Sequence, residues 1–283
     1  MLRVLIAGCG FVGLAVARAL HRTGWNVLGC THSEESARSL AAEPFAIRAA
    51  DLGDIGALRA LADWRGCDAI MHCASSGRGG AEAYRRVYLA GARNLIEALA
   101  PRRLIFTSST SVYAQNAGEW VTEESAAEPE RETGRILRET EDLVLANGGC
   151  VARLAAIYGP GRSVLLKKFF SGEAVIEGDG SRWINQVHRD DAASALGLLV
   201  ESEARGIFNV SDDAPMSQRD VYEWLAARFA RPLPPSGPID PTRKRGITSK
   251  RVNNAHLRAL GWMPRYPSFR DAVENDAELQ KPL

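Results

Sequence analysis

Six residues close to the N-terminus have a spacing that suits phosphate binding. Gly8-Cys9-Gly10-Phe11-Val12-Gly13 reads GxGxxG, and it lies between the apolar run 2–8 and a helix-like pattern over 11–24. In that setting the first glycine permits a tight turn, the second leaves room for a pyrophosphate, and the third lets the helix pack close to the strand. The phosphates would meet amide groups at the positive end of the helix. The motif predicts a dinucleotide site, and a glycine turn that binds nothing is the alternative.

The residues after the second strand-like run bear on which dinucleotide fits. A site that prefers NAD uses an Asp or Glu there to bind the ribose 2′-hydroxyl. This chain has Thr31, His32 and Ser33 instead, and Arg38 follows in the next helical pattern. These side chains can donate hydrogen bonds, and none of them repels a 2′-phosphate. The sequence favours NADP over NAD, although a plain surface histidine explains His32 equally well.

Two further strand ends could contact the same cofactor. Asp51 could accept a hydrogen bond from the adenine amino group, and Leu52 could cover the ring. Cys73, Ala74 and Ser75 end another strand-like run, where small residues would let a cofactor cross the sheet edge. Each of these segments is also compatible with an ordinary strand end.

Alternating strand-like and helix-like segments must position these residues. Apolar runs without polar alternation, as in strands covered on both faces, occur at 2–8, 26–30, 46–51, 69–74, 103–109 and 150–158. Patterns with apolar residues three and four apart lie between them, at 11–24, 33–43, 54–64, 82–100 and 132–148. This alternation predicts an α/β fold, a Rossmann-type doubly wound parallel sheet.

The pattern loosens after residue 160. Ser217 lies three residues before Asp220, which predicts a capped helix over 217–230, and a proline-rich loop follows at 231–241. A short helix is expected over 254–262. We therefore expect a dinucleotide-binding domain over 1–160 and a smaller C-terminal α/β substrate lobe over 161–283, with some chain returning to the sheet.

Composition excludes several classes of partner. The 283 residues carry a net charge of +1, so nothing draws the whole chain to nucleic acid or to an anionic membrane. No run reaches the roughly 18 apolar residues of a membrane helix, and no signal peptide is evident. The five cysteines have no CxxC spacing and fit small buried residues in a reducing cytoplasm. We expect a cytoplasmic protein with a small-molecule substrate and no metal site.

Four motifs in order resemble the extended short-chain dehydrogenase/reductase family, which includes nucleotide-sugar epimerases and dehydratases. They are RLIFTSSTSVYA (103–114), VARLAAIYGPGR (151–162), INQVHRDDAASA (184–195) and NAHLRALGWMPRYPSFRDAV (254–273). The resemblance implies a cofactor site that also includes Thr107, Ser108, Ile157 and Tyr158. Tyr158 would frame the nicotinamide amide rather than move protons.

The same resemblance implies a catalytic set, of which this chain keeps one member. Ser109 matches the catalytic Ser/Thr that hydrogen-bonds the reacting oxygen, unless its own loop satisfies it. The Tyr and Lys of the Tyr-x-x-x-Lys pair fall on Thr133 and Leu137, and the helix Asn falls on Tyr88. These departures, with the ETGR run at 132–135, resemble an atypical branch of the family that is called NAD(P)-dependent epimerase/dehydratase.

The absence of the Tyr and Lys should lower the rate of any reaction by the family's usual mechanism. A threonine hydroxyl is too weak an acid to replace the Tyr, and loss of a general acid typically costs about 10²–10⁴-fold. Thr133 nevertheless marks the catalytic position, and Arg135 could stabilise an oxyanion there, or could be a solvated helix charge. Tyr113 could be the acid, although the family uses it structurally.

Other residues could contact the substrate. Arg182 lies near the segment that grips a nucleotide-sugar diphosphate in the family, and His188 is a general acid or, more simply, a helix cap. We expect Tyr113, Arg182 and His188 to bind substrate. The basic run Arg243-Lys244-Arg245 could approach a substrate phosphate or form a solvated loop.

Two function classes follow from these residues. The first is an NAD(P)-dependent oxidoreductase or epimerase/dehydratase-like enzyme acting on a nucleotide sugar or another small polar carbonyl or alcohol. The second is a non-catalytic redox sensor that holds NADP, which loss of the Tyr and Lys favours. The helical segments 82–100 and 132–148 resemble a pair that forms a dimer core in the family, so we expect a homodimer.

Overall fold

The computed structural model of the chain describes residues 1–77, 79–240 and 248–280. These residues form two compact units. The first unit contains Met1–Val112, Ala127–Arg153 and Ala193–Phe208, and the second contains Tyr113–Ala126, Leu154–Ala192 and Asn209–Leu283. The basic run Arg243–Arg245 and the last residue of the expected proline loop lie outside the described residues.

A seven-stranded parallel sheet forms the centre of the first unit, which confirms the predicted fold class. The strand order is β12-β7-β5-β4-β1-β2-β3. The strands are β1 (Arg3–Ala7), β2 (Asn26–Thr31), β3 (Ala46–Ala49), β4 (Ala69–His72), β5 (Leu104–Ser109), β7 (Cys150–Leu154) and β12 (Gly206–Val210). Successive crossovers change direction between β1 and β4, and ligands of such sheets bind at the carboxyl ends of the strands there.

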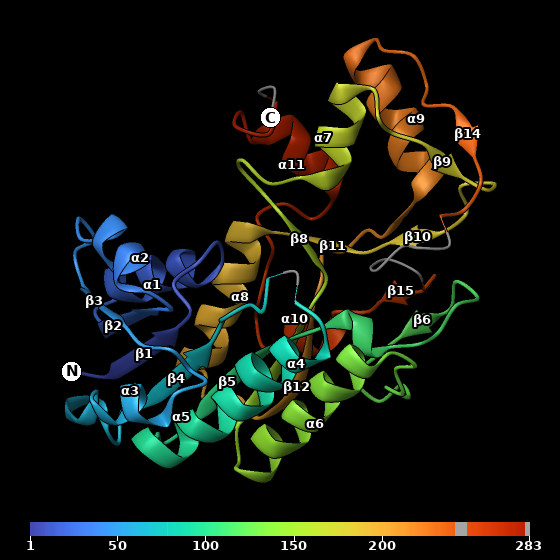
Figure 1. Cartoon of the computed structure of the whole chain (residues 1–283). Helices are drawn as coiled ribbons and strands as arrows, with labels where there is room; N and C mark the ends of the chain where they lie inside the picture. Colours follow the sequence, from blue (N-terminus) through green and yellow to red (C-terminus); the bar gives the residue numbers. More distant parts are fainter. Residues whose placement is uncertain (78, 241–247, 281–283) are drawn as a thin grey trace. The chain divides into compact units, whose positions relative to one another are not determined.

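Helices cover both faces of this sheet. Figure 1 shows α5 and α6 side by side on one face, with α1 and α8 on the other. The helices are α1 (Gly13–Arg22), α2 (Glu34–Ser39), α3 (Ile55–Arg59), η1 (Ala62–Trp64), α4 (Ala81–Tyr84), η2 (Arg85–Ala90), α5 (Gly91–Leu99), η3 (Thr110–Val112), α6 (Glu132–Ala146) and α8 (Arg189–Glu201). Gly24 and Gly148 follow α1 and α6 with φ of 91° and 68°, the left-handed conformation that glycine adopts without strain.

The outward face of α4 to α6 is charged. Arg85 Nη1 lies 3.1 Å from Glu139 Oε2, and Arg85 Nη2 lies 3.7 Å from Glu132 Oε1. No large hydrophobic side chain of α4 to α6 is among the exposed ones, although the whole of this layer is described. The apolar side chains of this layer that reach the surface do so only in part, as Leu89, Ile96 and Leu143 do, and homodimerisation stays a prediction.

The second unit contains only two-stranded sheets among its described residues, and it has its own apolar core. Its strands are β6 (Trp120–Val121), β8 (Ala156–Tyr158), β9 (Ile176–Glu177), β10 (Trp183–Ile184), β11 (Gln186–His188), β13 (Met216–Ser217), β14 (Ser236–Gly237) and β15 (Arg251–Val252). Its helices are α7 (Val164–Ser171), α9 (Gln218–Phe229), α10 (Ala255–Ala259) and α11 (Phe269–Asn275). Phe169, Tyr222 and Phe269 are buried in the core between α7, α9 and α11. Ser217 caps α9 by accepting from Asp220 N at 3.1 Å, as predicted.

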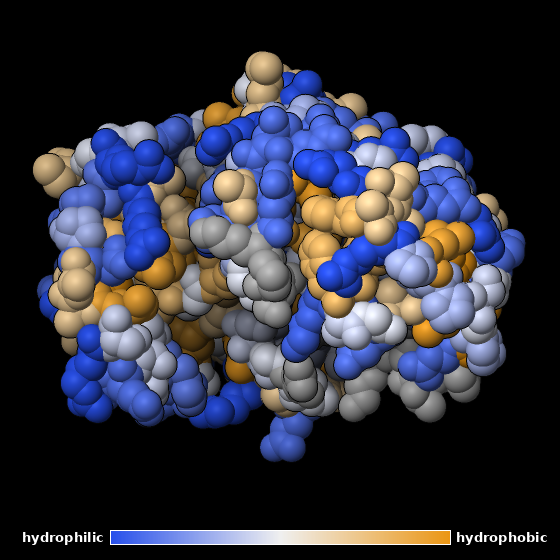
Figure 2. Space-filling model, turned by 90° about the horizontal axis from the view of Figure 1, so that it is seen from above, coloured by the Kyte–Doolittle hydropathy of each residue, from blue (hydrophilic) through white to orange (hydrophobic). Residues whose placement is uncertain are grey.

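The surface mixes hydrophobic and hydrophilic residues, and the thiols form no disulfide bonds. Figure 2 shows hydrophobic residues exposed in small groups between hydrophilic ones on the face in view. All five cysteines are free thiols. Across the described ranges no helix is long and apolar enough to cross a membrane, and no group of His, Cys, Asp and Glu is arranged to hold a metal ion.

Candidate functional site

The glycine loop between β1 and α1 is tightly fixed at two of its three glycines. Gly8 has φ of 108°, and Gly8 N and Cys9 N both donate to Cys30 O, at 3.0 and 2.8 Å. A Cβ on Gly8 would lie 2.4 Å from Ala74 N, and a Cβ on Gly13 would lie 2.1 Å from Gly8 O. A Cβ on Gly10 would meet nothing within 4 Å. The loop is packed against the fold at both ends and open at its centre.

This geometry fits a dinucleotide. The first turn of α1 has Val12 at its N-cap and no side chain capping it, although the helix runs for ten residues. Its amides and positive dipole end therefore have no side-chain oxygen competing with a phosphate. Phe11 and Val12 are half-buried beside the exposed Gly10. The residues that the motif singled out are together at the carboxyl end of β1.

The tip of β2 uses two of its hydroxyls internally. Thr31 Oγ1 donates to Ser33 O at 3.0 Å, and Ser33 Oγ accepts from Ser36 N at 3.3 Å as the cap of α2. The ring of His32 is 73% exposed, and Arg38 is exposed on α2 beside a hollow of about 350 Å³. His32 and Arg38 thus have side chains open to a ligand, whereas Thr31 and Ser33 maintain the turn.

The carboxylate after β3 is already engaged. Asp51 forms an ion pair with Arg86 on η2 and accepts from Gly53 N at 2.9 Å. His32 Nδ1 lies 3.6 Å from Asp51 Oδ1. Asp51 could contact adenine only if its carboxylate also kept, or gave up, its bonds to Arg86 and Gly53. Leu52 is only 6% exposed, which does not support its expected role as a cover for the adenine ring.

Arg86 was missed in the sequence because its spacing from the β2 tip carries no motif. Its guanidinium connects the η2 helix to Asp51, and through Asp51 to the exposed ring of His32. Two cationic or ionisable side chains therefore flank one carboxylate at this corner of the sheet.

Three consecutive hydroxyls end β5, and the structure separates their roles. Thr107 Oγ1 donates to His72 O at 2.9 Å, and Ser108 Oγ donates to the buried Glu141 Oε1 at 2.5 Å. Both side chains hold the fold together, so the expected cofactor contacts of Thr107 and Ser108 have no side-chain support. Ser109 is half-buried and its Oγ accepts from Ser111 N at 3.1 Å. Within the described chain its hydroxyl proton has no acceptor, so Ser109 can still donate to a substrate oxygen.

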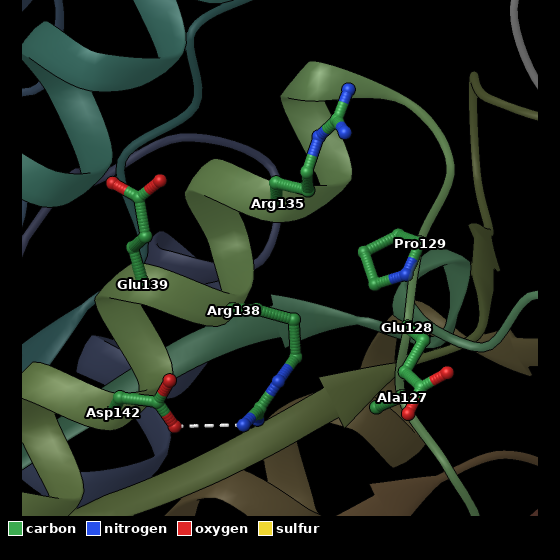
Figure 3. Close-up of a pocket in the computed structure, with 7 residues that line it drawn as sticks. All are labelled: Ala127, Glu128, Pro129, Arg135, Arg138, Glu139 and Asp142. Atoms are coloured by element: carbon green, nitrogen blue, oxygen red, sulfur yellow. Dashed lines mark hydrogen bonds and ion pairs between the residues drawn. The ribbon is translucent and has the colours of Figure 1, made fainter.

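Helix α6 carries the positions of the lost Tyr and Lys. Thr133 is half-buried in the first turn, and Leu137 one turn later is 5% exposed. Arg135 lies on the outward face and lines a surface hollow of about 320 Å³ (Figure 3). The remaining residues of that hollow are Ala127, Glu128, Pro129, Arg138, Glu139 and Asp142. Arg135 and Thr133 are on different faces of the helix, which removes the support for Arg135 as a catalytic group.

A buried ion pair anchors α6 to the sheet. Arg153 Nη2 on β7 lies 2.7 Å from Glu141 Oε2, and the two side chains are 2% and 0% exposed. The Ser108 hydroxyl donates to the other oxygen of the same carboxylate. The sequence does contain a sign of this ion pair, because Arg153 is a charged residue inside an otherwise apolar strand pattern. The pair sets the position of α6, and hence of Thr133, relative to β5.

In the second unit, two expected substrate contacts are structural. Tyr113 is fully buried and its hydroxyl donates to Asn209 Oδ1 at 2.8 Å. His188 is also fully buried, its Nδ1 accepts from Asp190 N at 3.2 Å, and its Nε2 lies 3.2 Å from Asp276 Oδ2. Burial lowers the pKa of His188. Neither side chain reaches the surface, so the structure gives no support to the expected substrate contacts of Tyr113 and His188, which stay a prediction.

The other expected contacts of this unit differ in exposure. Strand β8 pairs with β11, which places Ile157 opposite Val187 and Tyr158 opposite His188. Tyr158 is 2% exposed, so burial raises the pKa of its phenol, and Ile157 is half-buried. Arg182 is half-buried, and its Nε is buried without a hydrogen-bond partner in the described chain.

Comparison with known proteins gives consistent relatives over nearly the whole chain. The profile of the NAD dependent epimerase/dehydratase family matches residues 4–211. "Protein YeeZ" of Escherichia coli K12 is 32% identical over 94% of this chain and 97% of its own. The "3-diazoavenalumate denitrifying reductase" of a Streptomyces species is 28% identical over 96% of this chain and 99% of its own. The UDP-glucose 4-epimerase of Thermus thermophilus, solved with NAD, has a TM-score of 0.81 at 20% identity over 98% of both chains, a likeness of fold.

Proposed function

Because the chain belongs to the NAD-dependent epimerase/dehydratase family, we propose that it is an NAD(P)-dependent oxidoreductase acting on a small polar carbonyl or alcohol. The observation that carries the proposal is the glycine loop, closed at Gly8 and Gly13 and open at Gly10. Backbone amides of Phe11, Val12 and Gly13 would hold the pyrophosphate at the start of α1. When bound, the nicotinamide would supply or accept a hydride.

Ser109 is the residue through which this chain would act on substrate. Its hydroxyl would donate to the substrate oxygen and so orient the reacting carbon. Thr107 and Ser108 cannot share this role, because their hydroxyls bind His72 O and Glu141. A nucleotide sugar fits the family resemblance, and the similarity to a Streptomyces reductase supports reduction as the reaction class.

NADP is the preferred cofactor in this proposal. No carboxylate ends β2, and the exposed His32 and Arg38 can meet a 2′-phosphate. His32→Ala and Arg38→Ala should each weaken NADPH binding while leaving NADH binding nearly unchanged, measured by fluorescence titration. Arg22→Ala, an exposed Arg at the far end of α1, is the matched control. Equal losses for both nucleotides would contradict NADP preference without excluding dinucleotide binding.

The competing function is a sensor that holds NADP without turnover. The apolar Leu137 and the neutral Thr133 favour it, since neither supplies the proton that hydride transfer to a carbonyl needs. Purified protein with NADPH is incubated with nucleotide sugars and aldehydes, and absorbance at the nicotinamide band and product are followed. Turnover that falls about 10²-fold in Ser109→Ala supports the enzyme. Tight NADPH binding with no turnover across the panel supports the sensor.

The binding step itself is tested by Gly10→Glu. A carboxylate in the open space beside Gly10 would repel a pyrophosphate and occupy its place, so NADPH affinity should be lost while the far-UV spectrum is kept. Unchanged affinity in this variant would refute both functions, because each of them requires the glycine loop to hold the nucleotide.

A further inference from the structure

A π-helix, η2 (Arg85–Ala90), lies between α4 and α5 in the first unit. Helices of this kind are rare and are frequently found at functional sites. His72, the last residue of β4, contacts this helix, since its ring Nε2 donates to Val87 O at 3.0 Å. A carbonyl only accepts hydrogen bonds, so Nε2 carries the ring hydrogen. A side chain that binds a helix carbonyl distorts the helix locally, and His72 thereby fixes how the next residue, Tyr88, is presented.

Tyr88 extends from η2 to the carboxyl end of β4. Its hydroxyl oxygen accepts from Ser76 N at 3.3 Å. Its ring centroid lies 6.2 Å from that of His72 on β4 and 6.0 Å from that of Phe106 on β5. His72 and Phe106 are directly paired across the two strands. The phenol therefore lies at the ends of two neighbouring central strands of the sheet.

One of these strand ends packs against the glycine loop. A Cβ on Gly8 would lie 2.4 Å from Ala74 N, so the two backbones are in close contact. Ala74 is only two residues before Ser76, which binds the Tyr88 hydroxyl. The phenol thus adjoins the segment 73–75, along which we expect the cofactor to cross the edge of the sheet.

The other strand end carries Ser109. Thr107 Oγ1 donates to His72 O at 2.9 Å, which ties the end of β5 to the end of β4. Ser109 follows two residues later as the last residue of β5. Because β5, β4 and β1 are neighbours in the sheet, Tyr88, Ser109 and the glycine loop belong to one edge of the first unit.

Helix η2 also packs against α6, the helix that carries the positions of the lost Tyr and Lys. Arg85 Nη2 lies 3.7 Å from Glu132 Oε1, and Arg85 Nη1 lies 3.1 Å from Glu139 Oε2. Glu132 directly precedes Thr133, where the family resemblance places the catalytic Tyr. A phenol on η2 is therefore beside the position at which α6 no longer supplies one.

Polar atoms near the phenol are buried without partners. Ser76 Oγ and His72 Nδ1 have no hydrogen-bond partner within the described part of the chain. Burial lowers the pKa of His72 to about 4, so its ring is neutral at pH 7 and Nδ1 is an acceptor. Among the described residues no acceptor takes the hydroxyl proton of Tyr88. Buried polar atoms usually have partners, and a bound ligand or water would supply them here.

Exposure singles out the same part of the chain among the phenols. Four of the six tyrosines are at most 4% exposed, and they are Tyr113, Tyr158, Tyr222 and Tyr266. Tyr84 and Tyr88 are half-buried, and their rings meet edge to face with centroids 4.9 Å apart. A phenol that gives its proton to a substrate must be reachable by that substrate, so η2 and the end of α4 are where such a phenol can lie.

We propose that Tyr88 is the proton donor of the reaction and replaces the Tyr that is missing at Thr133. The inference rests on the proposed function and deepens it. In reduction, the carbonyl carbon gains a hydride from the nicotinamide while the π bond to oxygen breaks, and the oxygen gains the hydroxyl proton of Tyr88. The products are the alcohol and the oxidised nicotinamide. The phenolate keeps its hydrogen bond from Ser76 N and takes a proton from water.

The first test separates proton donation from a structural role. Turnover of the panel of nucleotide sugars and aldehydes with NADPH is measured for the unaltered protein, Tyr88→Phe and Tyr84→Phe. Tyr88→Phe keeps the ring and loses the proton, so kcat should fall about 10²–10⁴-fold while KM, NADPH affinity and the far-UV spectrum are kept. Tyr84→Phe, the matched control, removes the hydroxyl of the neighbouring ring and should keep kcat.

A second measurement locates the phenol without any substrate. The chain has six tyrosines, so the NMR signals of ¹³C-ring-labelled tyrosine are few, and Tyr88 is identified by its absence in Tyr88→Phe. NADP⁺, and NAD⁺ in a separate titration, should move the Tyr88 signal, because the charged nicotinamide comes close to this ring. The signal of Tyr222, in the core of the second unit, should stay in place.

Three results would overturn the role of Tyr88 alone: Tyr88→Phe turns over at the unaltered rate, KM and NADPH affinity change as much as kcat, or a bound nucleotide leaves the Tyr88 signal in place. A loss of turnover in Tyr84→Phe but not in Tyr88→Phe would assign the proton to the neighbouring ring instead. Absence of nucleotide binding, or of turnover with every compound, would refute the proposed function and the donor with it.

Discussion

Adding one methyl group to two glycines of the same loop should have opposite consequences. Gly13→Ala places a carbon 2.1 Å from Gly8 O, where ordinary van der Waals contact is 3.4 Å or more, and the obstructing atom is backbone. Gly8 cannot retreat, because a side chain there would meet Ala74 N and its own amide is bound to Cys30 O. The overlap must therefore be relieved by moving α1 away from β1.

The expected loss of stability follows from the packing that such a movement of α1 would disturb. Overpacking of a buried site costs about 1–3 kcal/mol, and the backbone contact places Gly13→Ala at the upper end. Part of this is offset by the helix propensity of Ala, which exceeds that of Gly by about 1 kcal/mol. Gly10→Ala meets nothing within 4 Å and should change the free energy of unfolding by less than about 0.5 kcal/mol.

Urea unfolding followed by circular dichroism measures both values, and NADPH titration is performed on the same samples. We expect Gly13→Ala to lower the unfolding midpoint and Gly10→Ala to leave it in place while weakening NADPH binding. If Gly13→Ala unfolds at the same urea concentration as the unaltered protein, the close approach of α1 to Gly8 is refuted. If Gly10→Ala binds NADPH normally, the open side of the loop is not the phosphate site.

Three other perturbations test the interior. Glu141→Leu removes the carboxylate that the buried Arg153 binds and should cost about 3–5 kcal/mol in urea unfolding; a cost below about 1 kcal/mol would contradict the buried pair. Burial lowers the pKa of His72 to about 4, so the unfolded chain takes up a proton first as pH falls. Stability is full above about pH 6.5 and is lost down to about pH 4, by about 3 kcal/mol from this group. His72→Phe should flatten that part of the pH profile of unfolding, and an unchanged slope would exclude His72 as the cause. Tyr113→Phe removes the donor to Asn209 and should cost about 1–3 kcal/mol without altering NADPH affinity; a changed affinity measured by titration would return Tyr113 to the site.

The sequence predicted the architecture because strand and helix periodicity is a local property. The order of elements and the Ser217 cap both follow from residues close together in the chain. The single strand expected over 150–158 was wrong in one respect, since it divides into β7 and β8 at residue 155. Ala155 N donates to Val210 O, whereas Ala156 N donates to Asn185 O. The chain therefore changes its hydrogen-bonding neighbour between β7 and β8.

The site was less predictable, because three-dimensional partners decide the role of each polar side chain. Thr107, Ser108 and Ser109 are equivalent in the sequence, yet two of them are engaged by groups 35 and 33 residues away. Tyr113 was expected near a substrate, and Asn209, which binds it, is 96 positions further on. Spacing along the chain carries no information about such distant partners.

The interleaving of the two units has a consequence for how this protein can be divided. The chain passes between them five times, and the residues 193–208 return to the first unit after the second has largely been built. A fragment of residues 1–160 made alone would lack the edge strand β12 and would leave β7 as an open, aggregation-prone edge. The second unit consists of three separate segments, so it cannot be exchanged with that of a relative as one continuous piece of chain.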